Sequence, residues 1–246
     1  MSTSLLKEGQ LFLGIDGGGS KCKAVITDIN LNVLGSGISG PANPLHGYEQ
    51  TLNSIVHSTQ LALEDANIPQ QEISKLVAGV GVAGVNLPVL FEKVANWEHP
   101  FADLHLATDL HVACLGAHEG NDGAVMISGT GSCGFSYVNG KALTIGGHGF
   151  PHGDLGSGAW TGFQAISRVL LALDGLSAPT TLSEKILAYY DAKDELDLVE
   201  KVAKKPASHY AKVAGIVFEC ASNGDVISKE IISCGAKYLS DVARKL

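Results

Sequence analysis

The alternation of apolar and polar positions divides the chain into two halves that open in the same way. The first half begins with three apolar or alternating runs, each bounded by turn residues and typical of consecutive strands: Leu11–Asp16, Lys21–Asp28 and Val33–Ser39. The second half begins with three shorter runs of the same kind: Ala124–Ser128, Gly134–Val138 and Ala142–Ile145. Asn139-Gly140 supplies a hairpin turn between the last two.

Between these two sets, strand and helix patterns alternate. The spacing predicts helices over 50–66, 89–97 and 110–118, and strands over 76–82 and 104–108. Strands followed by helices indicate an α/β domain with a partly parallel sheet. From Ser157 to Leu246 the pattern is almost entirely helical, with breaks at Pro206 and at Asn223-Gly224.

The two strand sets share a glycine turn. Asp16-Gly-Gly-Gly-Ser20 aligns with Ser128-Gly-Thr-Gly-Ser132 at an offset of 112 residues (128 minus 16), which matches both outer glycines and the serine. Each turn has an apolar strand before it and a hairpin after it. We therefore predict a duplicated architecture of two similar lobes, with domains at 1–119 and 120–246.

Composition limits the classes of function. Hydrophobic residues make up 45% of the 246 residues, enough for a well-filled core, and the net charge of −8 argues against a nucleic-acid partner. The N-terminus does not resemble a signal peptide, and the apolar stretch 76–91 is interrupted by glycines and Asn86, so we expect no membrane partner. The cysteines are odd in number and lack a CxxC pair, which favours reduced thiols and a cytoplasmic protein.

The glycine turns suit a phosphate, although a glycine-rich hairpin alone is more often a plain turn. Glycines allow the backbone to approach a ligand closely, and turns that present successive N–H groups bind anions. Neither turn is GxGxxG or GxxxxGK[ST], and neither opens onto a helix, so the dinucleotide-binding fold and the P-loop are poor fits.

Five segments in order carry a family resemblance: LGIDGGGSKCKAVI, TDLHVACLGA, AVMISGTGSCGF, GGHGFPHGDLGSGAW and VAGIVFECASNGD. Together they resemble the BadF/BadG/BcrA/BcrD-type ATPase family, in the branch of N-acetylglucosamine kinase and bacterial glucosamine kinase. The larger group is the sugar kinase–hsp70–actin superfamily. The resemblance implies two ribonuclease H-like lobes of the actin-like ATPase fold with a cleft between them, the second lobe rich in helices.

The resemblance also implies how ATP and Mg²⁺ bind. The first turn would hold phosphates through Gly17, Gly18, Gly19, Ser20 and Lys21. The second turn would hold them through Gly129, Thr130, Gly131 and Ser132. Asp16 would face the magnesium ion through water, although an aspartate at this place also caps turns. Lys21 could equally be an ordinary surface residue.

Asp109 is the candidate catalytic residue. It stands between an expected strand and an expected helix, so its position is also typical of an N-cap. The resemblance implies a general base beside the sugar 6-hydroxyl, and phosphoryl transfer needs an acceptor for that proton.

For the amino sugar, the resemblance implies binding by Asn43, Gly147, His148, Gly149 and Asp154. A turn role for Asn43 before Pro44 is equally compatible with its surroundings. Residues 82–84 would line the same cleft.

The segment GGHGFPHGDLGSG at 146–158 also raises the question of zinc, because His148 and His152 are four residues apart. That spacing serves a metal on a helix, which Pro151 and the glycines exclude. The segment departs from the family pattern at His148, where an indole is usual, and at Leu155, where a glutamate is usual. We interpret the imidazole as favouring glucosamine over N-acetylglucosamine.

The resemblance implies an adenosine-binding strand and glycine turn after the helix that ends in LSDVARKL. The sequence stops there, so we expect a truncated second lobe and weak ATP affinity. It further implies a homodimer. The alternative function is a non-catalytic sugar or nucleotide sensor, whereas an activator of a metalloenzyme would need an iron–sulfur cysteine pattern that the sequence lacks.

Overall fold

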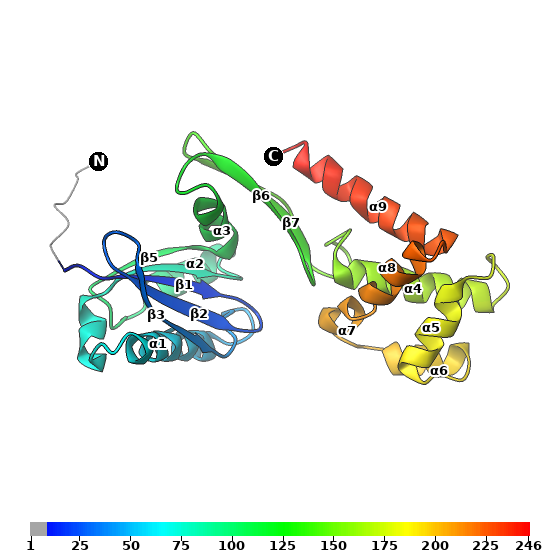
Figure 1. The fold of residues 1–246 in the computed structure, drawn as a ribbon, viewed down its shortest axis with the longest axis horizontal. Helices are drawn as coiled ribbons and strands as arrows, with labels where there is room; N and C mark the ends of the chain where they lie inside the picture. Colours follow the sequence, from blue (N-terminus) through cyan, green and yellow to red (C-terminus); the bar gives the residue numbers. More distant parts are fainter. Residues whose placement is uncertain (1–8) are drawn as a thin grey trace. The chain divides into compact units, whose positions relative to one another are not determined.

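The computed structural model describes residues 9–246, so the first eight residues of the N-terminus, over which no signal peptide is predicted, lie outside the described part. The described chain divides into two compact units: unit 1 ends at Asn121 and unit 2 begins at Asp122. The domain limits proposed from the sequence lie two residues before this division and stay a prediction. Figure 1 shows the elements of each unit.

Unit 1 is a five-stranded sheet with helices packed on it. Its strands run in the order β3-β2-β1-β4-β5. The elements are β1 (Phe12–Gly17), β2 (Cys22–Thr27), β3 (Val33–Ser39), α1 (Tyr48–Asp65), the 3₁₀ helix η1 (Gln70–Lys75), β4 (Val77–Val82), α2 (Pro88–Ala95), β5 (Asp103–Thr108) and α3 (Asp109–Ala117). β1, β2 and β3 pair antiparallel, as the hairpins predicted, whereas β1, β4 and β5 pair parallel.

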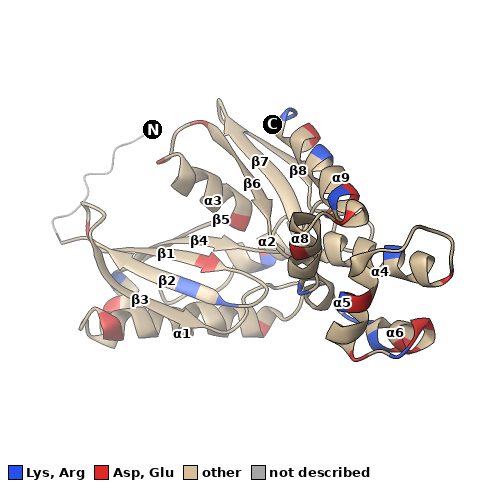
Figure 2. Cartoon of the chain, turned by 45° about the vertical axis from the view of Figure 1, so that its right-hand side comes forward, with Lys and Arg blue, Asp and Glu red and all other residues tan. Residues whose placement is uncertain are grey.

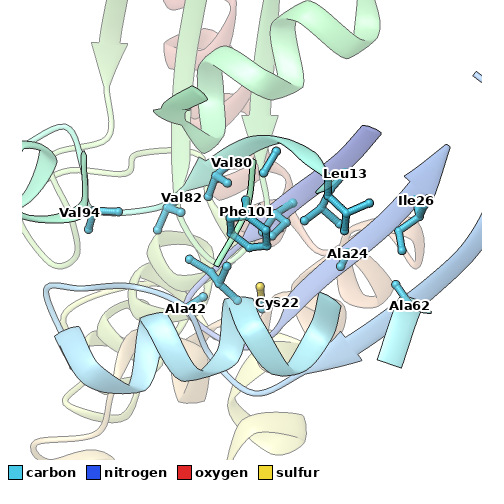
Figure 3. Close-up of a cluster of buried hydrophobic side chains, with 14 of the residues drawn as sticks. Leu13, Cys22, Ala24, Ile26, Ala42, Ala62, Val80, Val82, Val94 and Phe101 are labelled. Carbon is cyan, nitrogen blue, oxygen red and sulfur yellow. The ribbon is translucent and has the colours of Figure 1, made fainter. Parts of the chain in front are cut away.

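Helix α1 lies directly on β2 and β3 (Figure 1), and two glycines of β3 make the close approach possible. A Cβ on Gly35 would overlap the carbonyl of Ala62, and one on Gly37 would overlap the carbonyl of Ser58. The buried core between α1 and the sheet includes Leu13, Ile26 and Phe101 (Figure 3). The apolar side chains that alternate along β1 thus supply the core, because every second residue of a strand faces the same side.

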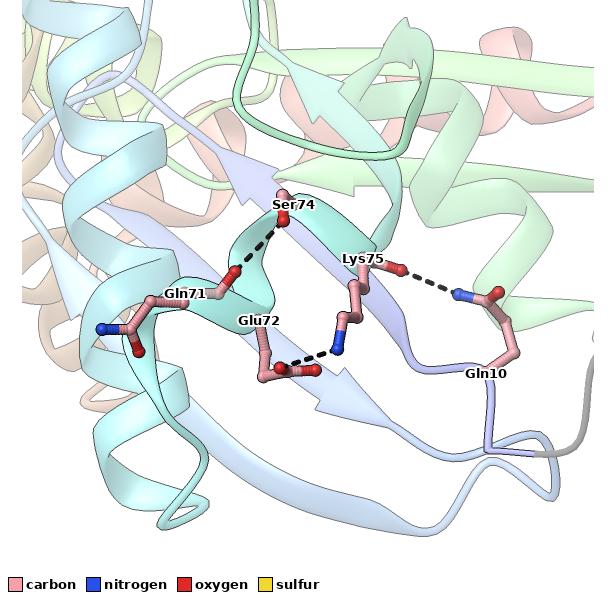
Figure 4. Close-up of polar contacts among 5 residues, drawn as sticks. All are labelled: Gln10, Gln71, Glu72, Ser74 and Lys75. Atoms are coloured by element: carbon pink, nitrogen blue, oxygen red, sulfur yellow. Dashed lines mark hydrogen bonds and ion pairs between the residues drawn. The ribbon is translucent and has the colours of Figure 1, made fainter.

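Two hydrogen bonds at the starts of β1 and β4 accompany their parallel pairing, and Figure 4 shows the one made by Gln10. The Gln10 side-chain amide donates to the carbonyl of Lys75 at 2.9 Å, and the N–H of Val77 donates to the carbonyl of Leu11 at 3.2 Å. Lys75 also pairs with Glu72 within η1 at 2.8 Å. The bonds of Gln10 and Val77 agree with the register of β1 and β4, in which both strands end at the same edge of the sheet.

Unit 2 opens with a three-stranded antiparallel sheet in the order β6-β7-β8 and continues as helices. The elements are β6 (Gly123–Ser128), β7 (Ser132–Val138), β8 (Lys141–Gly146), α4 (Gly158–Leu173), α5 (Thr181–Tyr190), α6 (Glu195–Val202), α7 (Ala207–Ala211), α8 (Ala214–Ser222) and α9 (Val226–Ala243). The repeat of three strands is therefore confirmed, and the predicted breaks fall at the N-cap of α7 (Pro206) and the C-cap of α8 (Asn223).

The helices of unit 2 pack around a core of their own, which includes Ile166, Leu182 and Val217. Acidic and basic residues are interspersed along these helices (Figure 2), and on α9 Asp241 pairs with both Lys237 and the C-cap residue Arg244. Among residues 9–246, no helix combines the length and the apolar character that a membrane crossing requires.

Candidate active site

Asp16 and Asp109 stand at one edge of the sheet of unit 1. The parallel strands β1, β4 and β5 end together there, and such carboxyl ends are where open α/β sheets bind ligands. In the register, Asp16 pairs with Gly81 and Gly81 pairs with Ala107, which is two residues before Asp109. Two strand spacings, about 10 Å, therefore separate the backbones that carry the two carboxylates.

Asp109 is the first residue of α3 and is partly buried. The interpretation of Asp109 as the N-cap is wrong: Thr108 caps the helix, because its Oγ1 accepts a hydrogen bond from the His111 N–H at 3.1 Å. Asp109 Oδ1 instead accepts from the Leu110 N–H at 2.9 Å. Burial raises the pKa of Asp109, and the charge of Asp16 raises it further against the opposing effect of the Leu110 bond. A carboxylate of raised pKa is a better proton acceptor for an alcohol.

The position of Asp109 depends on a glycine in the neighbouring strand. A Cβ on Gly81 would lie 2.9 Å from Val112 Cβ, so α3 begins this close to the sheet only because β4 has a glycine there. The close contact between the start of α3 and Gly81 was not evident from the sequence, because Gly81 is one of several glycines in an apolar run.

The first glycine turn has its carbonyls bonded to the protein. Gly17 O accepts from the Ala83 N–H at 2.8 Å, and Gly18 O accepts from the Ala42 N–H at 2.8 Å. Because a trans peptide places its C=O and N–H on opposite sides, the Gly19 N–H points away from Ala42. Within residues 9–246 that N–H donates no hydrogen bond, and a Cβ on Gly19 would meet no atom within 4 Å. The turn therefore presents an N–H group at an open surface, with Ser20 and Lys21 also exposed.

The second glycine turn is oriented in the same way by α4. The Gly158 and Ala159 N–H groups, at the start of α4, donate to Gly129 O at 2.8 Å and to Thr130 O at 3.2 Å. The N–H groups of Thr130 and Gly131 consequently point away from α4, and neither donates a hydrogen bond within the described chain. Two adjacent N–H groups of a turn that have no acceptor of their own are suited to an anion. The predicted Ser132 differs from them: its hydroxyl is buried and donates to Leu155 O at 2.7 Å.

Residues 146–158, here called the sugar loop after the role predicted for them from the sequence, lie against this second turn. The Gly147 N–H donates to Ser132 O at 3.0 Å, and Gly147 and Gly149 have φ values of +69° and +84°. His148 is exposed. Asp154 is half-buried, has φ +59°, and accepts from the Gly149 N–H at 3.2 Å through Oδ1. The predicted residues Gly147, His148, Gly149 and Asp154 therefore belong to one loop beside the predicted residues of the second turn.

Asn43 lies in unit 1 beside the first turn, since Ala42 bonds to Gly18. Its Oδ1 accepts from the Leu45 N–H at 3.0 Å, so the turn role considered from the sequence is present in the structure. Gly84, with φ +82°, packs against the Asn43 side chain. Asn43 is thus held at the sheet edge that carries Asp16, and its role toward a sugar stays a prediction.

The residues at this edge fit a magnesium ion only together with a phosphate. Among residues 9–246, no group of three or more His, Cys, Asp or Glu side chains is placed to hold a metal. Mg²⁺ is usually bound by one or two carboxylates plus phosphate oxygens, and the exposed carboxylate of Asp16 beside the Gly17–Lys21 turn meets that requirement.

Sequence reasoning missed the groups that orient the turns. Ala42, Ala83, Gly158 and Ala159 act through backbone N–H groups, which no side-chain motif reveals. The one usable signal was Ser157 before an apolar helical run, since serine is a common N-cap and does accept from the Trp160 N–H at 3.1 Å.

Comparison with known proteins identifies the family of the chain. Residues 13–246 match the model of the BadF/BadG/BcrA/BcrD ATPase family. The chain is 35% identical to the glucosamine kinase GspK of Vibrio cholerae, over 90% of this chain and 75% of that protein. It is 28% identical to the N-acetyl-D-glucosamine kinase of Dictyostelium discoideum, over 95% and 78%.

Solved structures show the same fold. A protein of Chromobacterium violaceum, provisionally assigned as an N-acetylglucosamine kinase, superimposes with a TM-score of 0.87 at 26% identity, covering 96% of this chain and 82% of that one. The chain therefore belongs to the BadF/BadG/BcrA/BcrD ATPase family. The family and the α/β fold class predicted from the sequence are confirmed.

Proposed function

We propose that the protein is an amino-sugar kinase that transfers the γ-phosphoryl group of ATP to the 6-hydroxyl of glucosamine or N-acetylglucosamine. The observation that carries the proposal is Asp109, a half-buried carboxylate of raised pKa at the sheet edge that also holds Asp16 and the first glycine turn. The sugar kinases among its relatives support the substrate class.

In the proposed reaction Asp109 accepts the proton of the 6-hydroxyl as its oxygen forms a bond to the γ-phosphorus, and the bond to the bridging oxygen breaks to release ADP. The open N–H groups at Gly19, Thr130 and Gly131 bind phosphate oxygens, and Lys21 adds a positive charge. Asp16 would hold Mg²⁺, which when bound neutralises phosphate charge. Asn43 and the sugar loop orient the sugar.

The test is an assay of ADP release with glucosamine and ATP. Asp109→Asn keeps the shape of the side chain but removes the base, so we expect kcat to fall by about 10²–10⁴-fold. The matched control is Asp103→Asn, at the other end of β5, where the exposed carboxylate accepts from the Leu104 N–H at 2.9 Å and lies 3.2 Å from His105 Nε2. If the parent chain is inactive on both sugars, the proposed kinase activity is refuted. If Asp109→Asn keeps full activity, the proposed role of Asp109 as general base is refuted.

For the choice of sugar, we propose that glucosamine is preferred because His148 stands exposed in the loop where an indole is usual in the family. A polar imidazole offers less apolar surface to an acetyl group. We expect kcat/KM to be higher for glucosamine than for N-acetylglucosamine, and His148→Trp to shift the ratio toward the acetylated sugar. A clear preference of the parent for N-acetylglucosamine would contradict this assignment.

A further inference from the structure

The side chain of Asp154 links the sugar loop to the second glycine turn. Its Oδ1 accepts from the Gly149 N–H at 3.2 Å, within the loop. Its Oδ2 lies beside Gly131: a Cβ added to Gly131 would be only 2.6 Å from this oxygen. One carboxylate therefore touches the backbone of both segments.

Asp154 is held in this place by an unusual backbone. Its φ of +59° lies in the left-handed region, which costs an aspartate more than a glycine. The Ser157 N–H donates to Asp154 O at 3.1 Å, which fixes the turn that leads into α4. Strain of this kind persists only where surrounding contacts determine the conformation.

Gly129 and Gly131 flank the same turn but differ in surroundings. A Cβ on Gly129 would meet no atom within 4 Å, whereas a Cβ on Gly131 would meet the Asp154 carboxylate. Neither glycine has a positive φ, so alanine suits the backbone at both positions. Comparing Gly129→Ala with Gly131→Ala therefore distinguishes the effect of a methyl group in the turn from the effect of displacing the Asp154 carboxylate.

We propose that Gly131 and Asp154 form a positioning contact that fixes the sugar loop against the phosphate-binding turn. Gly131 then influences sugar affinity although it belongs to the phosphate turn. The neighbouring bond from Ser132 Oγ to Leu155 O, at 2.7 Å, holds the next pair of residues in the same alignment. This proposal rests on the proposed function, because it takes the loop to bind an amino sugar.

The first test measures sugar binding without nucleotide, by calorimetry of the full chain with glucosamine and with N-acetylglucosamine. We expect Gly131→Ala to weaken sugar binding by about tenfold or more, since small misplacements of binding groups have large effects. Gly129→Ala is expected to keep the sugar affinity of the parent. Unchanged affinity in Gly131→Ala, or equal losses in both variants, would overturn the proposal.

The second test needs no sugar and is a double-mutant cycle on thermal unfolding. Gly131→Ala should lower the unfolding midpoint, and Asp154→Gly in the same chain should restore most of the loss, because it removes the carboxylate that the new methyl group meets. Additive effects would refute the contact. A parent that binds neither sugar would refute the proposed function and the effect on affinity, while the cycle would still decide whether the contact exists.

Discussion

Among single residues, Asp109 shows most clearly how the position of a side chain changes its pKa. Burial and the nearby charge of Asp16 both raise its pKa above the usual value of about 3.9. Since a general base acts only when ionised, the rate should fall as the pH drops through that raised pKa. We therefore predict that the acid limb of kcat/KM lies at a higher pH than an ordinary aspartate would give, measured from about pH 4.5 to 8.

Removing the charge of Asp16 should shift the acid limb of the kcat/KM profile to lower pH. In Asp16→Asn one of the two causes that raise the pKa of Asp109 is absent, so the limb shifts to lower pH whatever the height of the profile. Asp103→Asn, distant along β5, should leave the limb in place. A limb that stays at the parent pH in Asp16→Asn would show that the Asp16 charge does not act on the base.

The residues of the candidate site could be predicted from the sequence only as far as side chains mark them. Asp16, Asp109 and the glycine turns stand out because strands end in them. The burial of Asp109 and the left-handed backbone of Asp154 depend on packing that joins distant segments, such as Gly81 with Val112. The N-cap was assigned one residue late because Thr108 and Asp109 are both capable of capping.

At the scale of elements, Asp225 joins the starts of two helices in unit 2. Its Oδ1 accepts from the Ser228 N–H and hydroxyl at 2.8 Å and caps α9. Its Oδ2 accepts from the Thr180 hydroxyl at 2.7 Å and from the Thr181 N–H at 3.0 Å, where α5 begins. One carboxylate thus stabilises two helix N-termini, whose dipoles both favour a negative charge.

We predict that Asp225→Ala destabilises unit 2 by about 1–2 kcal/mol, the range for loss of a helix cap. Burial alone would raise the pKa of Asp225, but the hydrogen bonds outweigh it and lower the pKa to about 2. The contribution of Asp225 to stability is therefore fully present above its unfolded-state pKa of about 3.9 and is lost as the pH falls toward 2. Urea unfolding at neutral and acidic pH measures it. Asp241→Ala, in exposed ion pairs on α9, should change the stability little, and an equal loss there would contradict the capping role.

Elements were the most predictable level, because their periodicity is local. The apolar runs predicted every strand of both sheets in the described chain to within a few residues. The strand order was not predictable: it depends on β1 pairing with β2 on one side and with β4 on the other, across a long stretch of intervening chain. The bond from Gln10 to Lys75 that helps to set this register has no signature in the sequence.

At the scale of the whole molecule, each unit has its own core, its own glycine turn and one tryptophan. Trp97 packs edge-on against Phe101 beside the core of unit 1, and Trp160 of α4 packs against the core of unit 2. The sequence has no other tryptophan, so Trp160→Phe leaves a fluorescence probe of unit 1 and Trp97→Phe leaves one of unit 2. Unfolding of the two units can therefore be followed separately in the full chain.

We predict that a non-hydrolysable ATP analogue with Mg²⁺ raises the unfolding midpoint reported by both probes. Binding to the native state at 100 times Kd adds about 2.7 kcal/mol, and this stabilisation reaches only those parts whose unfolding releases the ligand. The proposed function assigns phosphate binding to Gly19 in unit 1 and to Thr130 and Gly131 in unit 2, and on that proposal loss of either turn should release the nucleotide. A shift confined to the Trp97 probe would mean that the second turn does not bind phosphate, and one confined to the Trp160 probe would exclude the first.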